Sequence, residues 1–194
     1  MMKPVALRLI VIDAISFQLL WFIAVQGNDL FAAIAAVAHI ALYQFMRAVT
    51  RAQWCFIAAV ALTGGLIDTL IGTTGIIAFH GTLTISVHDW TWQIAPLWLW
   101  CLWLGFATTL LRSLSLLNHR PILAALIGSV AGPLSYWAGA TLSGSIFMRP
   151  LVHVIIFEAV MWAVLLPALL YITRAVTNTS EGEGDAHAQR LAQR

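Results

Sequence analysis

Six apolar segments, each roughly long enough to cross a lipid bilayer, dominate this sequence. They cover residues 5–25, 30–46, 54–79, 94–111, 121–140 and 151–172. A helix needs about 20 mostly apolar residues to span the hydrocarbon layer, where unpaired backbone groups are not tolerated. The pattern therefore predicts an all-α fold, a polytopic membrane bundle of six transmembrane helices within residues 1–176.

The composition excludes several other classes of protein. Apolar residues make up 61% of the chain and charged residues 9%, whereas roughly a quarter of a soluble domain is charged. The ten basic residues are scattered, so no surface for nucleic acid is predicted. Cys55 and Cys101 lie far apart in apolar segments, so neither a disulfide framework nor a metal site is indicated. The sequence identifies no cofactor.

Lysine and arginine are distributed unevenly between the two ends of the predicted helices. Nine of them flank the chain termini and the second and fourth connections: Lys3, Arg8, Arg47, Arg51, Arg112, Arg120, Arg174, Arg190 and Arg194. Only Arg149 falls on the other side. Because basic residues favour cytoplasmic loops, this asymmetry predicts that both termini are cytoplasmic.

The two ends of the chain differ in character. The first apolar segment is expected to be a retained helix and not a cleaved signal peptide, because it is long, contains Asp13 and Gln18, and has no small-x-small cleavage site. Residues 177–194 are polar and almost free of apolar side chains, so they predict a disordered cytoplasmic tail.

One longer periplasmic loop is predicted between the third and fourth helices, over residues 80–93. Leu83, Ile85 and Val87 alternate with polar residues, which is the period of a half-buried strand. Tryptophans follow at positions 90, 92, 98 and 100, and indoles favour the membrane surface. Both a hairpin-like flap and an irregular anchored loop are compatible with this pattern.

The third segment contains one carboxylate among glycines. On a helix Gly65, Asp68, Gly72 and Gly75 share one face. Small residues let membrane helices approach closely, and an acid in the bilayer is expected to face protein because lipid exposure costs several kcal/mol. Asp68 is therefore interpreted as a group that binds a proton, a cation or a headgroup, or as a hydrogen-bonded brace between helices.

The fifth segment provides a counterpart to this glycine face. Gly128, Gly132, Ser135 and Gly139 fall on one stripe, for which close packing is the simplest interpretation, and Pro133 should kink the helix.

Four residues form the candidate intramembrane polar site at the outer half of the bilayer: Asp68, Glu158, Tyr136 and Ser135. Four more residues are assigned to its periplasmic rim: His80, His88, Asp89 and His153.

A second polar pair is expected nearer the cytoplasm. Asp13 and His39 each lie eight residues inside their own antiparallel segments, which places them at matching depth. Contact between them would lower the cost of burying each group and hold a proton between them. Gln18 and Gln44 could extend this network.

Several blocks resemble a bacterial inner-membrane family catalogued as domain of unknown function 2878. They are DAISFQLLWFIAVQG (13–27), GGLIDTLIGTTGIIAF (64–79), APLWLWCLWLGFATTLLRSL (95–114) and GSVAGPLSYWAGATL (128–142). The resemblance implies a compact multi-helix protein of the bacterial inner membrane, with an association with lipid-modifying enzymes. Five residues match the family pattern: Asp68, Trp98, Gly132, Pro133 and Tyr136. Leu111 and Arg112 depart from it, because an Asn-His pair is expected there.

Three functions remain open at this stage, because no soluble-enzyme motif is present. The favoured one is the handling of a lipid or other hydrophobic molecule in a cavity of the bundle, as an accessory or a catalyst of membrane-lipid modification. The second is a small proton-coupled transporter or channel. The third is a structural subunit of a membrane complex. The expected partners are membrane lipids, other membrane proteins or lipid-modifying enzymes.

Overall fold

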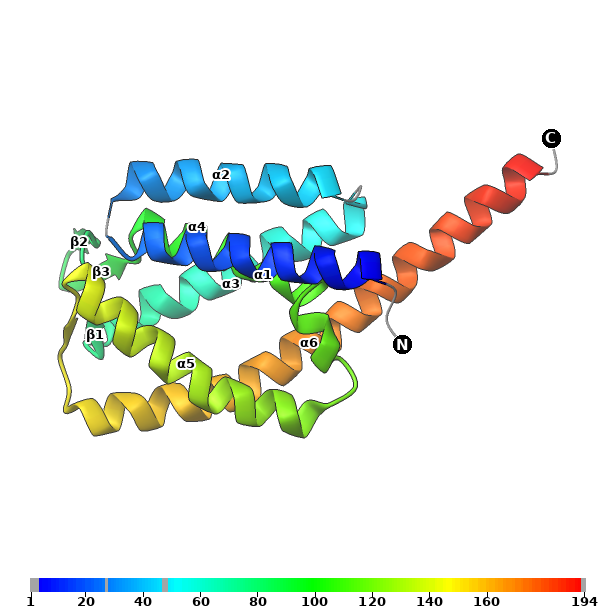
Figure 1. The fold of residues 1–194 in the computed structure, drawn as a ribbon. Coiled ribbons are helices and arrows are strands. Elements are labelled where there is room, and N and C mark those ends of the chain that lie inside the picture. The colour runs from blue at the N-terminus through cyan, green and yellow to red at the C-terminus, as the bar shows by residue number, and fades with distance from the viewer. Residues whose placement is uncertain (1–3, 27, 47–48, 193–194) are drawn as a thin grey trace.

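Six α-helices and four short strands make up the computed structural model (Figure 1), which describes residues 4–26, 28–46 and 49–192. Side chains are described over residues 7–26, 28–46 and 49–177. The helices are α1 (Pro4–Ala24), α2 (Asp29–Met46), α3 (Arg51–Thr73), α4 (Leu97–Leu111), α5 (Pro121–Ser143) and α6 (Leu151–Ala192). The strands are β1 (Ile77–Ala78), β2 (Leu83–Val87), β3 (Trp90–Ile94) and β4 (Ile146–Phe147), and a short 3-10 helix, η1 (Leu114–Leu117), follows α4.

Five of these helices are long and apolar enough to cross a membrane: α1, α2, α3, α5 and α6. Helix α4 has 15 residues, about 22 Å at 1.5 Å per residue, which is shorter than a hydrocarbon core of about 30 Å. The sequence predicted six spanning helices; the structure has five candidate spans and a shorter apolar helix among them. Because α4 packs against α1, α2 and α3, its apolar residues meet protein on several sides.

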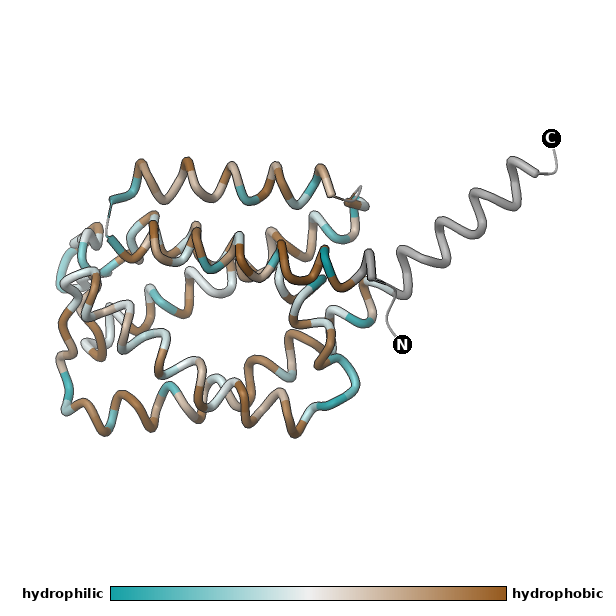
Figure 2. The backbone as a smooth tube through the Cα atoms, in the orientation of Figure 1, coloured by the Kyte–Doolittle hydropathy of each residue, from teal (hydrophilic) through white to brown (hydrophobic). Residues whose placement is uncertain are grey.

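The helices run back and forth, so the connections gather at two ends of the bundle (Figure 1). The α2–α3 and α4–α5 connections lie near the start of α1, and the α1–α2 and α5–α6 connections lie at the opposite end with the strands. Hydrophilic residues concentrate at these connections, while the helices are mostly apolar (Figure 2). This grouping of the connections matches the one predicted from the basic residues, in which the second and fourth connections lie on the same side as the chain termini. Lys3, Arg47 and Arg194 lie outside the described residues. Which end is cytoplasmic stays a prediction.

Helix α3 has well-defined signals at both ends. The Thr50 hydroxyl accepts a hydrogen bond from the Gln53 N–H, and the Gln53 side chain accepts one from the Thr50 N–H, which forms a capping box. The helix ends before Gly75, whose φ of 66° lets the chain close a Schellman motif. Gly75 is therefore a turn residue, and its predicted place on the helical face of Asp68 was wrong.

The long connection between α3 and α4 folds as a β-hairpin. Strands β2 and β3 pair antiparallel from Leu83 opposite Ile94 to Val87 opposite Trp90. The two-residue turn contains His88, which has a φ of 54°. This confirms the hairpin-like alternative over the irregular loop. Its position on a membrane surface stays a prediction.

Helix α6 continues to Ala192 and extends beyond the bundle (Figure 1). It therefore runs through most of residues 177–194, which the sequence predicts as a disordered tail. Ala, Glu, Gln and Arg have high helix propensity, and the segment is rich in them, which favours continuation of the helix. Residues 193–194 lie outside the described part of the chain.

The helices pack in an order that keeps α1 and α5 apart over most of their lengths. Helices α1 and α2 pack on α4, α4 packs on α3, α3 packs on α6, and α5 lies along α6. Short strands β1 and β4 pair Ile77 with Phe147 and so tie the α5–α6 connection to the end of α3. Helices α1 and α5 thus belong to opposite sides of the bundle and converge only near the strand end (Figure 1).

Candidate functional site

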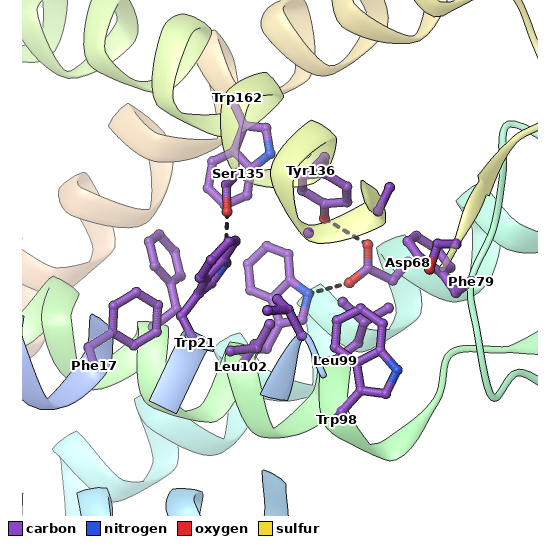
Figure 3. Close-up of a pocket in the computed structure, with 16 residues that line it drawn as sticks. Phe17, Trp21, Asp68, Phe79, Trp98, Leu99, Leu102, Ser135, Tyr136 and Trp162 are labelled. Atoms are coloured by element: carbon purple, nitrogen blue, oxygen red, sulfur yellow. Dashed lines mark hydrogen bonds between the residues drawn. The ribbon is translucent and has the colours of Figure 1, made fainter. Parts of the chain in front are cut away.

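A cavity of about 90 Å³ lies between α1, α4 and α5 (Figure 3). Aromatic side chains from α1, α4, α5 and α6 form a large part of its wall. Among the residues that line it, Asp68 of α3 is the only charged one. The cavity is therefore an apolar space with one acidic group, which matches the usual character of ligand pockets.

Asp68 is fully buried and hydrogen-bonded through both carboxylate oxygens. Tyr136 of α5 donates its phenol O–H to Oδ1 at 2.7 Å, and Trp103 of α4 donates its indole N–H to Oδ2 at 2.6 Å (Figure 3). Hydrogen bonds to an ionised acceptor are shorter and stronger than neutral ones. The carboxylate thus joins three helices, as the brace interpretation of Asp68 expected, and it also lines the cavity.

Glycines provide the room for the indoles beside Asp68. The Trp103 ring lies so close to Gly64 that a Cβ atom at Gly64 would overlap it, and the Trp162 ring lies against Gly132 in the same way. The two indoles stack with centroids 5.5 Å apart and an interplanar angle of 5°. Close helix approach also occurs, because a Cβ at Gly128 would meet the backbone of Trp162. The glycine faces therefore serve both helix packing and the seating of tryptophans.

A hydrogen bond between α1 and α5 lies at the mouth of the cavity. The Trp21 indole N–H donates to Ser135 Oγ at 3.0 Å, and both residues line the cavity. Ser135 is exposed and Trp21 is half-buried. In Figure 3 this pair and the Asp68 carboxylate lie on opposite sides of the lining residues. Because Ser135 is exposed, the cavity reaches the protein surface between α1 and α5 at this pair.

Glu158 of α6 lies behind the cavity wall. It is 1% exposed and neither carboxylate oxygen has a hydrogen-bond partner. It is near Asp68 and Tyr136, with which it interacts electrostatically, and beside the Trp162 indole one helical turn away. The buried Trp162 N–H is also without a partner. The structure therefore brings Asp68, Glu158 and Tyr136 together and places Ser135 at the mouth.

A family model described as a protein of unknown function (DUF2878) matches residues 10–168. The chain belongs to this family. A search of curated proteins found no match, and neither did a search of solved structures. The DUF2878 region includes the cavity, the acid pair and the helices that surround them, from residue 10 in α1 to the first 18 residues of α6.

The rim residues of this DUF2878 bundle do not assemble into a cluster of ligands. His80, His88, Asp89 and His153 are all exposed. His80 contributes through its backbone, since its N–H donates to Ser145 Oγ at 3.0 Å and its carbonyl accepts from the Trp98 indole at 3.1 Å. Over the described residues, no three His, Cys, Asp or Glu side chains are grouped so that they could hold a metal ion.

The second polar set is buried as expected but has a different geometry. Asp13 and His39 are both buried, yet no direct hydrogen bond or ion pair joins them in the described structure. Ser16 lies between them: its hydroxyl donates to the Asp13 carbonyl at 3.0 Å and is 3.0 Å from His39 Nδ1. On the other side of the ring, Nε2 is 2.7 Å from the hydroxyl of Thr108 on α4.

This network also differs from expectation at its edges. Gln18 and Gln44 are exposed, so they do not extend it. Arg112 is buried, with its guanidinium 4.1 Å from the centre of the Tyr43 ring. Asp13 Oδ2 accepts the Ser113 N–H at 3.3 Å, while Oδ1 has no partner.

Sequence reasoning missed the tryptophans and hydroxyls that complete both polar clusters: Trp21, Trp103, Trp162, Ser16 and Thr108. One general signal was available, because a buried indole N–H usually finds an acceptor. This rule does not predict which group accepts the hydrogen bond, because Trp98 donates to a backbone carbonyl at 3.1 Å, whereas Trp103 donates to Asp68.

Proposed function

We propose that this multi-pass membrane protein binds a hydrophobic molecule, a lipid in the first instance, in the cavity between α1, α4 and α5. The observation that carries the proposal is the combination of an aromatic wall with one buried carboxylate at the inner side. Apolar walls with a few polar groups that orient the ligand are the usual design of such sites. The bound molecule would place its chain among the aromatic rings and a polar group near Asp68.

The chemistry of the inner side favours a particular polar group. Among the residues that line the cavity there is no Lys, Arg or His, so nothing there attracts a phosphate or a carboxylate. Asp68 accepts hydrogen bonds, and Tyr136 holds its hydroxyl directly against it. A hydroxyl, amide or amine that donates a hydrogen bond suits this site, and an anionic headgroup does not.

The size of the cavity limits how much of a lipid enters. A water molecule needs roughly 10–15 Å³ of such volume, so about 90 Å³ accepts several waters or a short stretch of hydrocarbon. The remainder of a lipid would stay in the bilayer and pass between α1 and α5, at the Trp21–Ser135 pair. The protein would then act as an accessory or a catalyst of membrane-lipid modification, in a bacterial inner membrane with both termini in the cytoplasm.

Photo-crosslinking tests this proposal directly. A long-chain fatty alcohol with a diazirine near its hydroxyl is added to the protein in nanodiscs, and the labelled residues are mapped by mass spectrometry. We expect labels on cavity residues such as Leu102 and Tyr136, with stronger competition by unlabelled fatty alcohol than by a fatty acid of equal length. Labels confined to outward residues such as Val37 and Phe45, which are exposed on α2, would contradict the proposal.

A proton-coupled transporter is the second candidate, and the His39 network favours it. Each hydroxyl has one hydrogen to donate. When Ser16 and Thr108 both donate theirs to backbone carbonyls, they can only accept from His39, so both ring nitrogens must carry a hydrogen. If the Ser16 hydroxyl turns toward Nδ1, the ring is neutral. The ring of Phe17 lies near both the His39 ring and the Phe106 ring, with a centroid distance of 6.3 Å to each.

Vesicles that contain the purified protein and a trapped pH dye discriminate between the two candidates. A transporter acidifies or alkalinises the vesicle interior under an imposed gradient, whereas a lipid-binding protein leaves the dye signal at the level of empty vesicles. A structural subunit would also leave the dye signal at the level of empty vesicles, and it would copurify with a stoichiometric partner.

A further inference from the structure

Glu158 is the most unusual polar group among the described residues. It is 1% exposed on a membrane-spanning helix, and both of its oxygens lack a hydrogen-bond partner. An isolated buried carboxylate ion is among the most costly groups that a protein can contain. The cavity chemistry does not explain Glu158, because it lies outside the cavity wall.

Among the side chains that the structure describes, no basic one is placed to neutralise this acid. The groups that face it are Asp68 on α3 and Tyr136 on α5, both of which interact with it electrostatically. Over residues 49–177, the other titratable or charged groups on the helices packed around it are Arg51, Cys55, Cys101, His153, Tyr171 and Arg174. β1, β3 and η1 carry none.

These other groups lie too far along their helices or on other faces to act as counter-ions. Arg51 is 17 residues from Asp68, and Arg174 is 16 residues from Glu158, which is roughly 25 Å in each case. His153 is exposed and points about 140° away from Glu158 around the helix. The two acids therefore face each other without a cation.

A proton satisfies this arrangement better than a metal ion does. A hard cation needs about six oxygen ligands, and the described residues contain no group of three ligating side chains. A single proton neutralises one of the two carboxylates and binds to one carboxylate oxygen. Two acids in one site share protons in this way because both cannot be ionised at close range.

The hydrogen bonds decide which acid holds the proton. Asp68 receives two short bonds, from Trp103 and Tyr136, and these stabilise its ionised form. Glu158 receives no bond that meets hydrogen-bond geometry, and the Trp162 indole N–H, one helical turn further along α6, supports its ionised form only weakly. We infer that Asp68 and Glu158 form a proton-binding pair in the membrane interior, in which Glu158 holds the proton and Asp68 carries the negative charge. This site does not depend on whether the cavity binds a lipid.

Infrared spectroscopy of the protein in lipid membranes at neutral pH tests the inference. A protonated carboxyl has a C=O stretch that is well separated from the carboxylate bands, so the protonation of each acid is read from wild-type minus variant spectra. We expect Glu158→Gln to remove a carboxylic acid band and Asp68→Asn to remove carboxylate bands. The reverse assignment, or carboxylate bands lost in both variants, overturns the inference. Glu183→Gln, in the polar segment after residue 177, controls for the spectral effect of an ordinary ionised glutamate.

The pH dependence of unfolding gives a second reading that needs only the wild-type chain. An unfolded glutamate is ionised at neutral pH, so a protonated Glu158 means that the folded state binds one more proton than the unfolded state. The stability of the folded state therefore falls as pH rises, and the unfolding equilibrium constant increases tenfold per pH unit. A constant that does not change between pH 7 and 8 contradicts the inference. In Glu158→Gln, if it folds, the folded state binds one proton fewer than in the wild type, so the tenfold increase in the unfolding equilibrium constant per pH unit should be lost.

Discussion

Trp21 of α1 and Ser135 of α5 are 114 positions apart in the sequence and are joined by a hydrogen bond of 3.0 Å across the mouth of the cavity. The two helices belong to opposite sides of the bundle, and each packs mainly on other elements. On the proposed function, this hydrogen bond is therefore placed where a ligand from the bilayer would enter. This position makes the bond a candidate control point for access.

The first prediction is that loss of this bond speeds entry into the cavity. Trp21→Phe removes the donor and keeps an aromatic ring, while Ser135→Ala removes the acceptor. A net hydrogen bond contributes about 1 kcal/mol, so each variant should increase the rate of diazirine-alcohol labelling by about fivefold. Time courses of crosslinking measure this rate.

A double variant provides the control for that prediction. If the two residues act through their mutual bond, Trp21→Phe with Ser135→Ala should be no faster than either single variant. Additive increases in rate would mean that the bond does not control the mouth.

The second prediction concerns the donor that α5 provides to Asp68. Tyr136→Phe removes the O–H that lies 2.7 Å from the carboxylate and leaves the ring unchanged. Hydrogen bonds to charged groups contribute about 1.5–3 kcal/mol, so unfolding in mixed detergent micelles should show a loss of that size. Tyr171→Phe is the matched control, because Tyr171 is 68% exposed and its substitution should leave stability unchanged. Equal stability of the two variants would contradict the role of Tyr136.

The third prediction separates two glycines of α3. Gly64→Ala places a methyl group in the Trp103 ring, so the indole must move and its bond to Asp68 must lengthen. Overpacking costs about 1–3 kcal/mol, and the tryptophan fluorescence of the folded protein should change as well. At Gly72 the nearest atom to an added methyl would be the Gln93 carbonyl oxygen at 3.4 Å, an ordinary contact. Gly72→Ala should therefore be neutral or stabilising by up to about 1 kcal/mol.

The fourth prediction tests the buried histidine network. Thr108→Val keeps the shape of the side chain but removes the hydroxyl 2.7 Å from His39 Nε2. A buried polar group that loses its partner costs about 1–3 kcal/mol, which an unfolding titration should detect. In Thr141→Val the lost hydroxyl donates only to a carbonyl of its own helix at an exposed position. The free energy of unfolding of that control should differ from the wild-type value by less than about 0.5 kcal/mol. A similar loss in both variants would contradict the role of the Thr108 hydroxyl.

The sequence predicted much of the fold from local features. The apolar segments located the first residue of every helix within three positions, but they placed the end of α3 six residues too late and the end of α6 twenty residues too early. The alternation over residues 83–87 predicted a strand that the hairpin confirms. The inward orientation of Asp68 also followed from the cost of exposing an acid to lipid, and Asp68 is fully buried. Local pattern did not predict that α4 would be only 15 residues long, since its first residues continue the apolar run from β3.

What the sequence determined by itself is therefore the apolar segments, the strand alternation and the need to bury Asp68 and Glu158, because each of these depends on a residue and its near neighbours. Only the tertiary structure decided which groups meet them. Trp103 is 35 positions from Asp68 and Tyr136 is 68 positions away. Whether these side chains meet depends on how far each helix is rotated and shifted against the others. That rotation and shift follow from the packing of all the helices together, including the seating of Trp103 on Gly64, and no single segment encodes them.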